Sequence, residues 1–113
     1  MTDFTGHTSI CTRSNRFELS QSFCNKFVKG NTFAGLHWDV EEGELEFTFY
    51  PSDSDVASRI PIAKQPGGGA RIYCAKFCKR TLRSYKMQKY CDYTIDVTKA
   101  GDLIVKFKLE KIL

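Results

Sequence analysis

The chain has 113 residues, of which 42% are hydrophobic and 27% are charged, a composition typical of a globular domain in water. No segment reaches the roughly 20 apolar residues that a membrane helix needs, and the polar first ten residues do not resemble a signal peptide. We therefore expect a single cytoplasmic domain, residues 1–113, that lacks a membrane segment and keeps its five cysteines as thiols.

The net charge of +4 is unevenly distributed along the chain. Residues 1–56 contain four Lys or Arg and nine Asp or Glu, which gives −5, whereas residues 57–113 contain thirteen and four, which gives +9. A positive half of this size favours an anionic partner, nucleic acid above all. A solvated charged surface explains the same pattern.

The first half begins with residues 1–15, which have no hydrophobic period and are expected to form a flexible arm. Residues 16–50 then predict a strand, a helix and a hairpin, a βαββ unit. The strand starts at Arg16, and Ser20 or Ser22 caps the helix, for which Gly30 is the expected stop. The hairpin turns at Glu42-Gly43, between a strand rich in aromatic residues and a strand in which Leu45, Phe47 and Phe49 alternate with polar residues.

Residues 51–70 are expected to connect the first half to the second. Around Pro61 they could form an edge strand, where the missing amide of proline does little harm. Three glycines, 67–69, invite comparison with a phosphate-binding loop, but such a loop opens a helix, and the residues that follow here read as a strand. A flexible connector is the better interpretation.

Residues 71–109 predict a second βαββ unit. A strand from Arg71 leads into a helix from Ala75 to about Met87, and a hairpin with its turn at residues 99–102 follows. On one face of the helix the spacing i, i+3, i+4, i+7 forms a positively charged stripe, which consists of Lys76, Lys79, Arg80 and Arg83.

The two units share their order and several residues, which favours an internal duplication. Arg16 and Arg71 open the two strands, and Phe-Cys recurs at residues 23–24 and 77–78. A single hairpin is marginal in water, so the units are expected to pack about a pseudo-two-fold axis. The predicted fold is mainly β with two short helices (α+β), a small closed barrel of two βαββ units.

This arrangement resembles the AbrB/MazE/SpoVT swapped-hairpin family, here as two tandem copies in one chain. The resemblance rests on a basic residue before an apolar strand, a capped amphipathic helix, and a hairpin that contains an Asp in each half. It implies an interleaved barrel and, for many members, DNA binding by transcription regulators or antitoxins. The layout is also similar to uncharacterised bacterial and phage proteins.

The leading hypothesis is a DNA-binding regulator that uses a basic surface, mostly of the second half, as a monomer or homodimer. The candidate nucleic-acid contacts are Arg16, Arg71, Lys76, Lys79, Arg80 and Arg83. The first hairpin is acidic and would repel phosphate. The alternative is a phage- or mobile-element-encoded inhibitor, antitoxin-like or a DNA mimic, that binds a host protein.

Catalysis is not expected, because neither His7 nor His37 has a nucleophile or carboxylate motif beside it, and His37 is expected in the core. No cofactor is expected. A zinc site of Cys24, Cys74, Cys78 and a histidine is conceivable, but the spacing matches no recognised ligand pattern, so we expect no metal.

Overall fold

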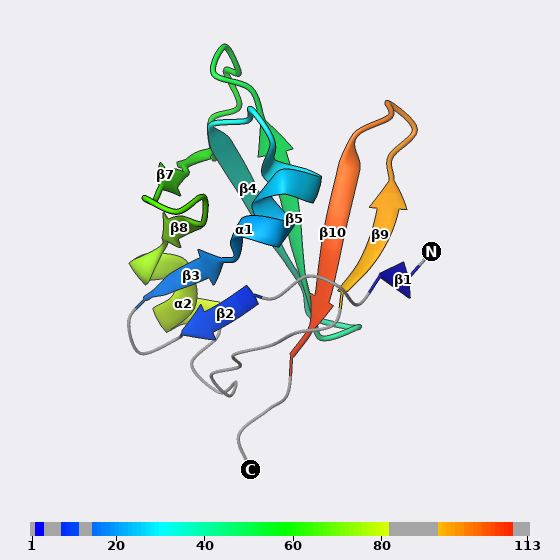
Figure 1. Ribbon diagram of the computed structural model, residues 1–113. Helices are drawn as coiled ribbons and strands as arrows, with labels where there is room; N and C mark the ends of the chain where they lie inside the picture. The colour runs from blue at the N-terminus through cyan, green and yellow to red at the C-terminus, as the bar shows by residue number, and fades with distance from the viewer. Residues whose placement is uncertain (1, 4–7, 12–14, 82–92, 110–113) are drawn as a thin grey trace.

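The computed structural model describes residues 2–3, 8–11, 15–81 and 93–109, whose strands form two antiparallel sheets (Figure 1). As predicted, the fold is mainly β with two short helical segments, an α+β protein. The strands are β1 (Thr2–Asp3), β2 (Thr8–Cys11), β3 (Arg16–Leu19), β4 (Phe33–Asp39), β5 (Glu44–Tyr50), β6 (Ile60–Pro61), β7 (Ala63–Lys64), β8 (Ala70–Tyr73), β9 (Tyr93–Val97) and β10 (Leu103–Lys108). The helical segments are α1 (Gln21–Phe23), which continues into the π-helix η1 (Cys24–Val28), and α2 (Ala75–Thr81).

The larger sheet has six strands in the order β1-β9-β10-β5-β4-β6. It contains both predicted hairpins, β4–β5 and β9–β10. Strand β5 of the first hairpin pairs with strand β10 of the second, and Phe47 lies opposite Val105. Side chains alternate across the sheet, so Leu45 and Phe47 are buried while Glu44 and Glu46 face outward. This alternation is the reason that one face of the sheet can build the core.

The smaller sheet has four strands in the order β2-β3-β8-β7. Its central strands are the first strands of the two predicted units, and they pair antiparallel with Phe17 opposite Ile72. Both of these residues are completely buried. In both sheets, therefore, a strand of the first half lies next to the corresponding strand of the second half.

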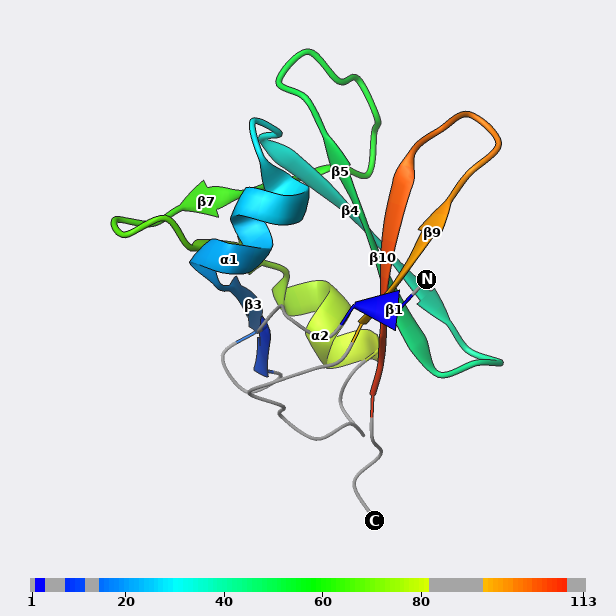
Figure 2. The same cartoon turned by 45° about the vertical axis from the view of Figure 1, so that its right-hand side comes forward.

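Aromatic side chains from both sheets fill one core. The ring of Phe17, from the small sheet, lies 5.3 Å from that of Phe47 in the large sheet. The ring of Phe107, on the neighbouring strand β10, also lies 5.3 Å from that of Phe47. On the first helical segment, Phe23 packs edge-on to Tyr93 at 5.7 Å. Figure 2 shows this segment lying across the opening between the sheets. The helix therefore closes the side of the core that the strands leave open.

The first helical segment starts as predicted and ends differently. The Ser20 side chain accepts a hydrogen bond from the Phe23 amide, which caps the helix. Gly30 was expected to stop the helix, but the residue at the C-cap is Lys29, whose φ is +50°. The reason is the wide final turn, in which the Lys29 amide bonds to the Cys24 carbonyl, five residues back, at 2.7 Å. The ammonium group of Lys64 donates to the Lys29 carbonyl at 3.3 Å.

Residues 1–15 were predicted to be a flexible arm, yet their described part supplies strands β1 and β2. These strands pair with β9 and β3, whose edges offer unpaired backbone groups. Strands of two and four residues need no hydrophobic period, and for this reason the sequence pattern does not reveal them. Among the described residues, no helix is both long and apolar enough to cross a membrane.

The segment 51–70 is more ordered than a flexible connector. Its strand β6 pairs with the edge of the large sheet at Phe33, which confirms the edge strand predicted around Pro61. The glycines form a tight turn between β7 and β8, in which the Gln65 amide bonds to the Gly69 carbonyl at 2.9 Å. Gly67 and Gly68 have φ of +92° and +95°, a conformation that residues with a Cβ rarely adopt. A strand follows the glycines, as predicted, instead of the helix that a phosphate loop needs.

Candidate nucleic-acid interface

The outward face of β3 and β8 carries a block of four polar side chains. Alternation buries Phe17 and Ile72, and it therefore turns Arg16, Glu18, Arg71 and Tyr73 away from the core. The strand register sets Arg16 opposite Tyr73 and Glu18 opposite Arg71. Tyr73 is 54% exposed. Two arginines and an aromatic ring are thus held on a rigid sheet surface.

Glu18 binds both arginines through one carboxylate oxygen. Its Oε1 lies 3.0 Å from Nε of Arg16 and 3.2 Å from Nε of Arg71, and the three side chains are 31–39% exposed. The carboxylate offsets the repulsion between two guanidinium groups that the register brings together. A hydrogen bond with the Tyr73 side chain, together with the nearby Glu18, raises the pKa of Arg71 above its already high ordinary value, so its charge is permanent.

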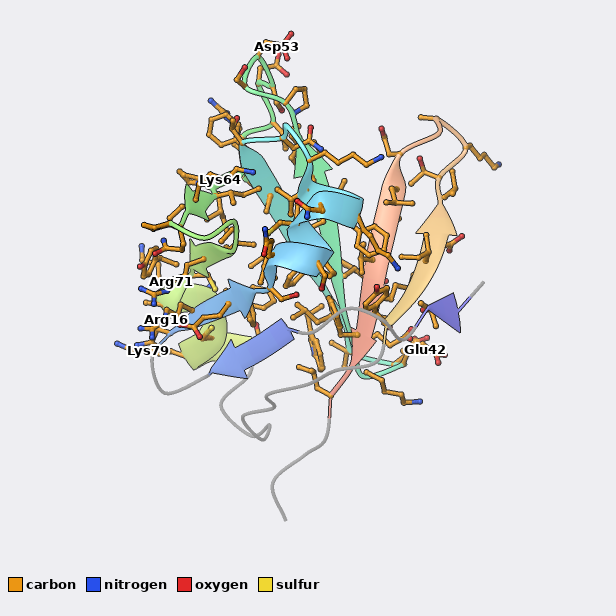
Figure 3. The ribbon with its side chains drawn as sticks, in the orientation of Figure 1. Arg16, Glu42, Asp53, Lys64, Arg71 and Lys79 are labelled. Carbon is orange, nitrogen blue, oxygen red and sulfur yellow. The ribbon has the colours of Figure 1, made fainter. Side chains whose placement is uncertain are left out.

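Helix α2 adds three positive charges next to this block. It follows β8 directly, and the Cys74 amide at its start bonds to the Asn15 carbonyl, just before β3, at 3.0 Å. Lys76, Lys79 and Arg80 on this helix are exposed. Figure 3 shows Arg16, Arg71 and Lys79 on the same flank of the molecule. We call Arg16, Arg71, Lys76, Lys79 and Arg80 the basic face.

The basic face unites five of the six predicted contact residues, and the sixth, Arg83, lies outside the described residues. Sequence reasoning missed Glu18 and Tyr73 as members of this surface. The alternation of β3 placed Glu18 outward, but nothing local in the sequence shows that it would meet Arg71. That contact depends on the pairing of two strands more than fifty residues apart.

Acidic side chains gather at another end of the molecule, in the turn between β4 and β5. Asp39 orders this turn, because its carboxylate accepts from the Glu42 amide at 3.1 Å and its carbonyl accepts from the Gly43 amide at 2.8 Å. Figure 3 shows Glu42 on the flank opposite Arg16 and Lys79. Val40, in the same turn, is 79% exposed. The charge asymmetry of the sequence is therefore an asymmetry in space.

The strand register corrects one expectation about a polar residue. His37 was expected in the core, but Leu36 and Trp38 face inward, so His37 is exposed on the outer side, opposite Glu46. Within the described part of the chain, no three His, Cys, Asp or Glu side chains are grouped so that they could hold a metal ion. Cys24 lies in the first helical segment, with its sulfur near the Leu19 carbonyl, whereas Cys74 and Cys78 contact each other.

Comparison with known proteins found no matching family model, no matching curated protein and no matching solved structure. The function has to be inferred from the chain's own surfaces.

Proposed function

We propose that this protein binds DNA through the basic face and acts as a regulator of transcription. The observation that carries the proposal is the convergence of Arg16, Arg71 and Lys79 on one flank, where Glu18 contacts both arginines. The exposed Lys76 and Arg80 lie on the same helix as Lys79. The net charge of the basic face and Glu18, five positive and one negative, is +4. Lys and Arg that neutralise phosphates release condensed counterions, which supplies affinity for DNA of any sequence. Arginine forks can add base readout.

We further propose that the two halves are copies related by a pseudo-two-fold axis. When the halves are aligned on Arg16 and Arg71, Phe17 matches Ile72, and these two residues are opposite each other in the small sheet. In the hairpins Phe47 matches Val105, and these two are opposite each other in the large sheet. A two-fold axis between antiparallel strands sets the residue on the axis opposite its own equivalent, so the pairs Phe17–Ile72 and Phe47–Val105 support the duplication.

The packing of the first helical segment supports the resemblance to the swapped-hairpin family. Phe23 belongs to the first half, yet its ring lies 5.7 Å from Tyr93 and 5.9 Å from Phe107, both in the hairpin of the second half. Exchange of hairpins between units is the defining feature of that family. We propose that the two sheets, which share one core, close into the small barrel that the resemblance implies.

The proposed axis explains why Arg16 and Arg71 lie close together in the basic face. These are equivalent residues, and the axis brings them together at one carboxylate. The helices are not equivalent in charge, because α2 exposes Lys76, Lys79 and Arg80, whereas the helical segment of the first half has Lys26 as its one basic residue. The second half would therefore make most phosphate contacts.

The proposal is tested by fluorescence anisotropy with a labelled mixed-sequence duplex between 50 and 200 mM salt. Four neutralised phosphates predict a slope of log affinity against log salt near −3.6, which is a loss of about 150-fold over this range. Lys79→Ala should weaken binding and make the slope shallower by about 0.9. Lys99→Ala, an exposed lysine in the β9–β10 turn, is the matched control and should change little. Absence of binding at 50 mM salt would refute the proposal.

The acidic turn favours a second candidate, an inhibitor that binds a host protein. Val40 is 79% exposed between Asp39 and Glu41, so an apolar anchor is surrounded by negative charge, as on a surface that competes with nucleic acid. Capture of one host protein after nuclease treatment, lost on Val40→Asp and kept on Lys79→Ala, would favour this candidate. In both cases the proposed activity is binding and not catalysis.

A further inference from the structure

Two buried thiols meet at the start of the helix that carries most of the basic face. Cys74 lies between strand β8 and helix α2, and its carbonyl accepts the first helical hydrogen bond, from the Cys78 amide at 3.0 Å. The two Sγ atoms lie 3.5 Å apart. Cys74 is 7% exposed and Cys78 is 1% exposed.

We propose that Cys74 and Cys78 form a redox-active dithiol that closes to an intrachain disulfide when a hydroperoxide oxidises it. A disulfide bond is about 2.05 Å long, so the sulfurs have to approach by about 1.5 Å. Side chains at i and i+4 of a helix have Cβ atoms about 5–6 Å apart, while a disulfide needs about 3.5–4.5 Å. Closure therefore tightens the first turn of α2.

The reaction balances with hydrogen peroxide as the oxidant. The thiolate of Cys78 attacks one peroxide oxygen and breaks the O–O bond, which leaves a sulfenic acid on Cys78 and, after protonation, one water molecule. The sulfur of Cys74 then attacks Sγ of Cys78, loses its proton and releases the second water as the S–S bond forms. The sulfurs lose two electrons in total, and the peroxide gains them.

The contact between the thiols favours this order of events. A hydrogen bond from Cys74 lowers the pKa of the Cys78 thiol, and the same interaction, with burial, raises the pKa of the Cys74 thiol. The pair therefore gives up its first proton more readily than an isolated buried cysteine, for which burial raises the pKa, as it does for Cys24.

The first half of the chain supplies an internal control for the geometry. Its helical segment has the same backbone bond, from the Cys24 amide to the Ser20 carbonyl at 3.0 Å, but a serine occupies the capping position. Ser20 uses its side chain to accept from the Phe23 amide. Cys24 fills the buried position without a sulfur at the cap, so packing of the helix does not require two thiols.

The test uses the full chain, treated with hydrogen peroxide under native conditions, alkylated and digested with trypsin. Because Lys76 separates the two cysteines, the disulfide would join the peptides Ile72–Lys76 and Phe77–Lys79. The number of free thiols per chain should fall by two, and dithiothreitol should restore the starting number. Cys24→Ala should still give the linked peptide, while Cys78→Ala should not. Cys74→Ser, which places a favourable capping residue in the same position, keeps the comparison valid if Cys78→Ala does not fold.

Three outcomes would overturn the proposal. One is the absence of the linked peptide, and another is its formation no faster in the native protein than in urea. The third is preferential bridging of Cys24 or of the two cysteines outside the described side chains, Cys11 and Cys91.

A further consequence rests on the proposed function: tightening of α2 moves Lys76 and Lys79, so the oxidised protein should bind duplex DNA with altered affinity. The linked peptide is measured without DNA, and its detection therefore does not depend on that function.

Discussion

Replacement of Glu18 by glutamine should strengthen DNA binding and weaken the fold at the same time. The carboxylate oxygen lies 3.0 Å and 3.2 Å from the two arginines, with all three side chains about one third exposed. Glutamine keeps the length of the side chain and one hydrogen-bond acceptor but removes the charge. An exposed ion pair contributes about 0.2–1 kcal/mol, so the loss of two should lower the free energy of unfolding by about 0.4–2 kcal/mol.

The gain in affinity follows from counterion release. Removal of one negative charge raises the net charge of the basic face from four to five, which steepens the salt slope by about 0.9. At 0.1 M salt, one order of magnitude below the 1 M reference, the dissociation constant should fall about eightfold. The assays are anisotropy with a mixed-sequence duplex across a salt series and urea denaturation followed by tryptophan fluorescence.

Glu42→Gln is the matched control for this experiment. It changes the total charge by the same amount, but in the acidic turn on the opposite flank. If both variants strengthen binding equally, the effect belongs to the overall charge and the basic face is not the contact surface. If Glu18→Gln leaves the salt slope unchanged, the arginines beside it do not touch phosphate, and the reasoning is refuted.

Three other predictions concern the fold. Phe47→Ala removes a completely buried ring at the junction of the two halves and should cost about 3–5 kcal/mol in urea denaturation; a loss below 1 kcal/mol would contradict the shared core. The Tyr93 hydroxyl is buried with no hydrogen-bond partner in the described structure, so Tyr93→Phe should stabilise the protein by about 1 kcal/mol, seen as a rise of about 4 °C in Tm, whereas a fall would reveal a partner. A hydrogen bond from the Val97 amide, followed by the Lys106 ammonium group, holds the pKa of Asp96 below its usual range. The stabilisation is therefore present above the unfolded pKa, near 4, and is lost as pH falls through the lower folded value, and Asp96→Asn should flatten that part of a stability curve measured from pH 5 to pH 2.

The sequence was informative where one short pattern is sufficient. Alternation in residues 44–49 and 103–109 predicted which side chains of both hairpins are buried, because a sheet with one covered face requires a period of two. Gly43 and Gly101 marked the hairpin turns through their positive φ. The repeated order of elements also predicts two units, each a strand, a helix and a hairpin.

The hydrophobic pattern of the sequence does not predict the structure of a segment that depends on the strand with which it pairs. Strands β1 and β2 form because β9 and β3 present open edges, and nothing in residues 2–11 indicates this. The register of β4 is set by its pairing with β5, so His37 lies outside although its neighbours are apolar. For the same reason the sequence pattern does not show that Glu18 contacts Arg71, because that contact requires β3 to pair with β8.

The pairing of strands across the halves has a consequence for how the protein is made. Strand β3 cannot pair with β8, nor β5 with β10, until the ribosome has added more than fifty further residues. At a synthesis rate of about 5–20 residues per second, the interval is about 3–12 s. During that time the nascent first half exposes two strand edges and the rings of Phe17 and Phe47. Chaperone capture on the ribosome, and slow refolding in vitro because of the long contacts, are the expected results of this topology.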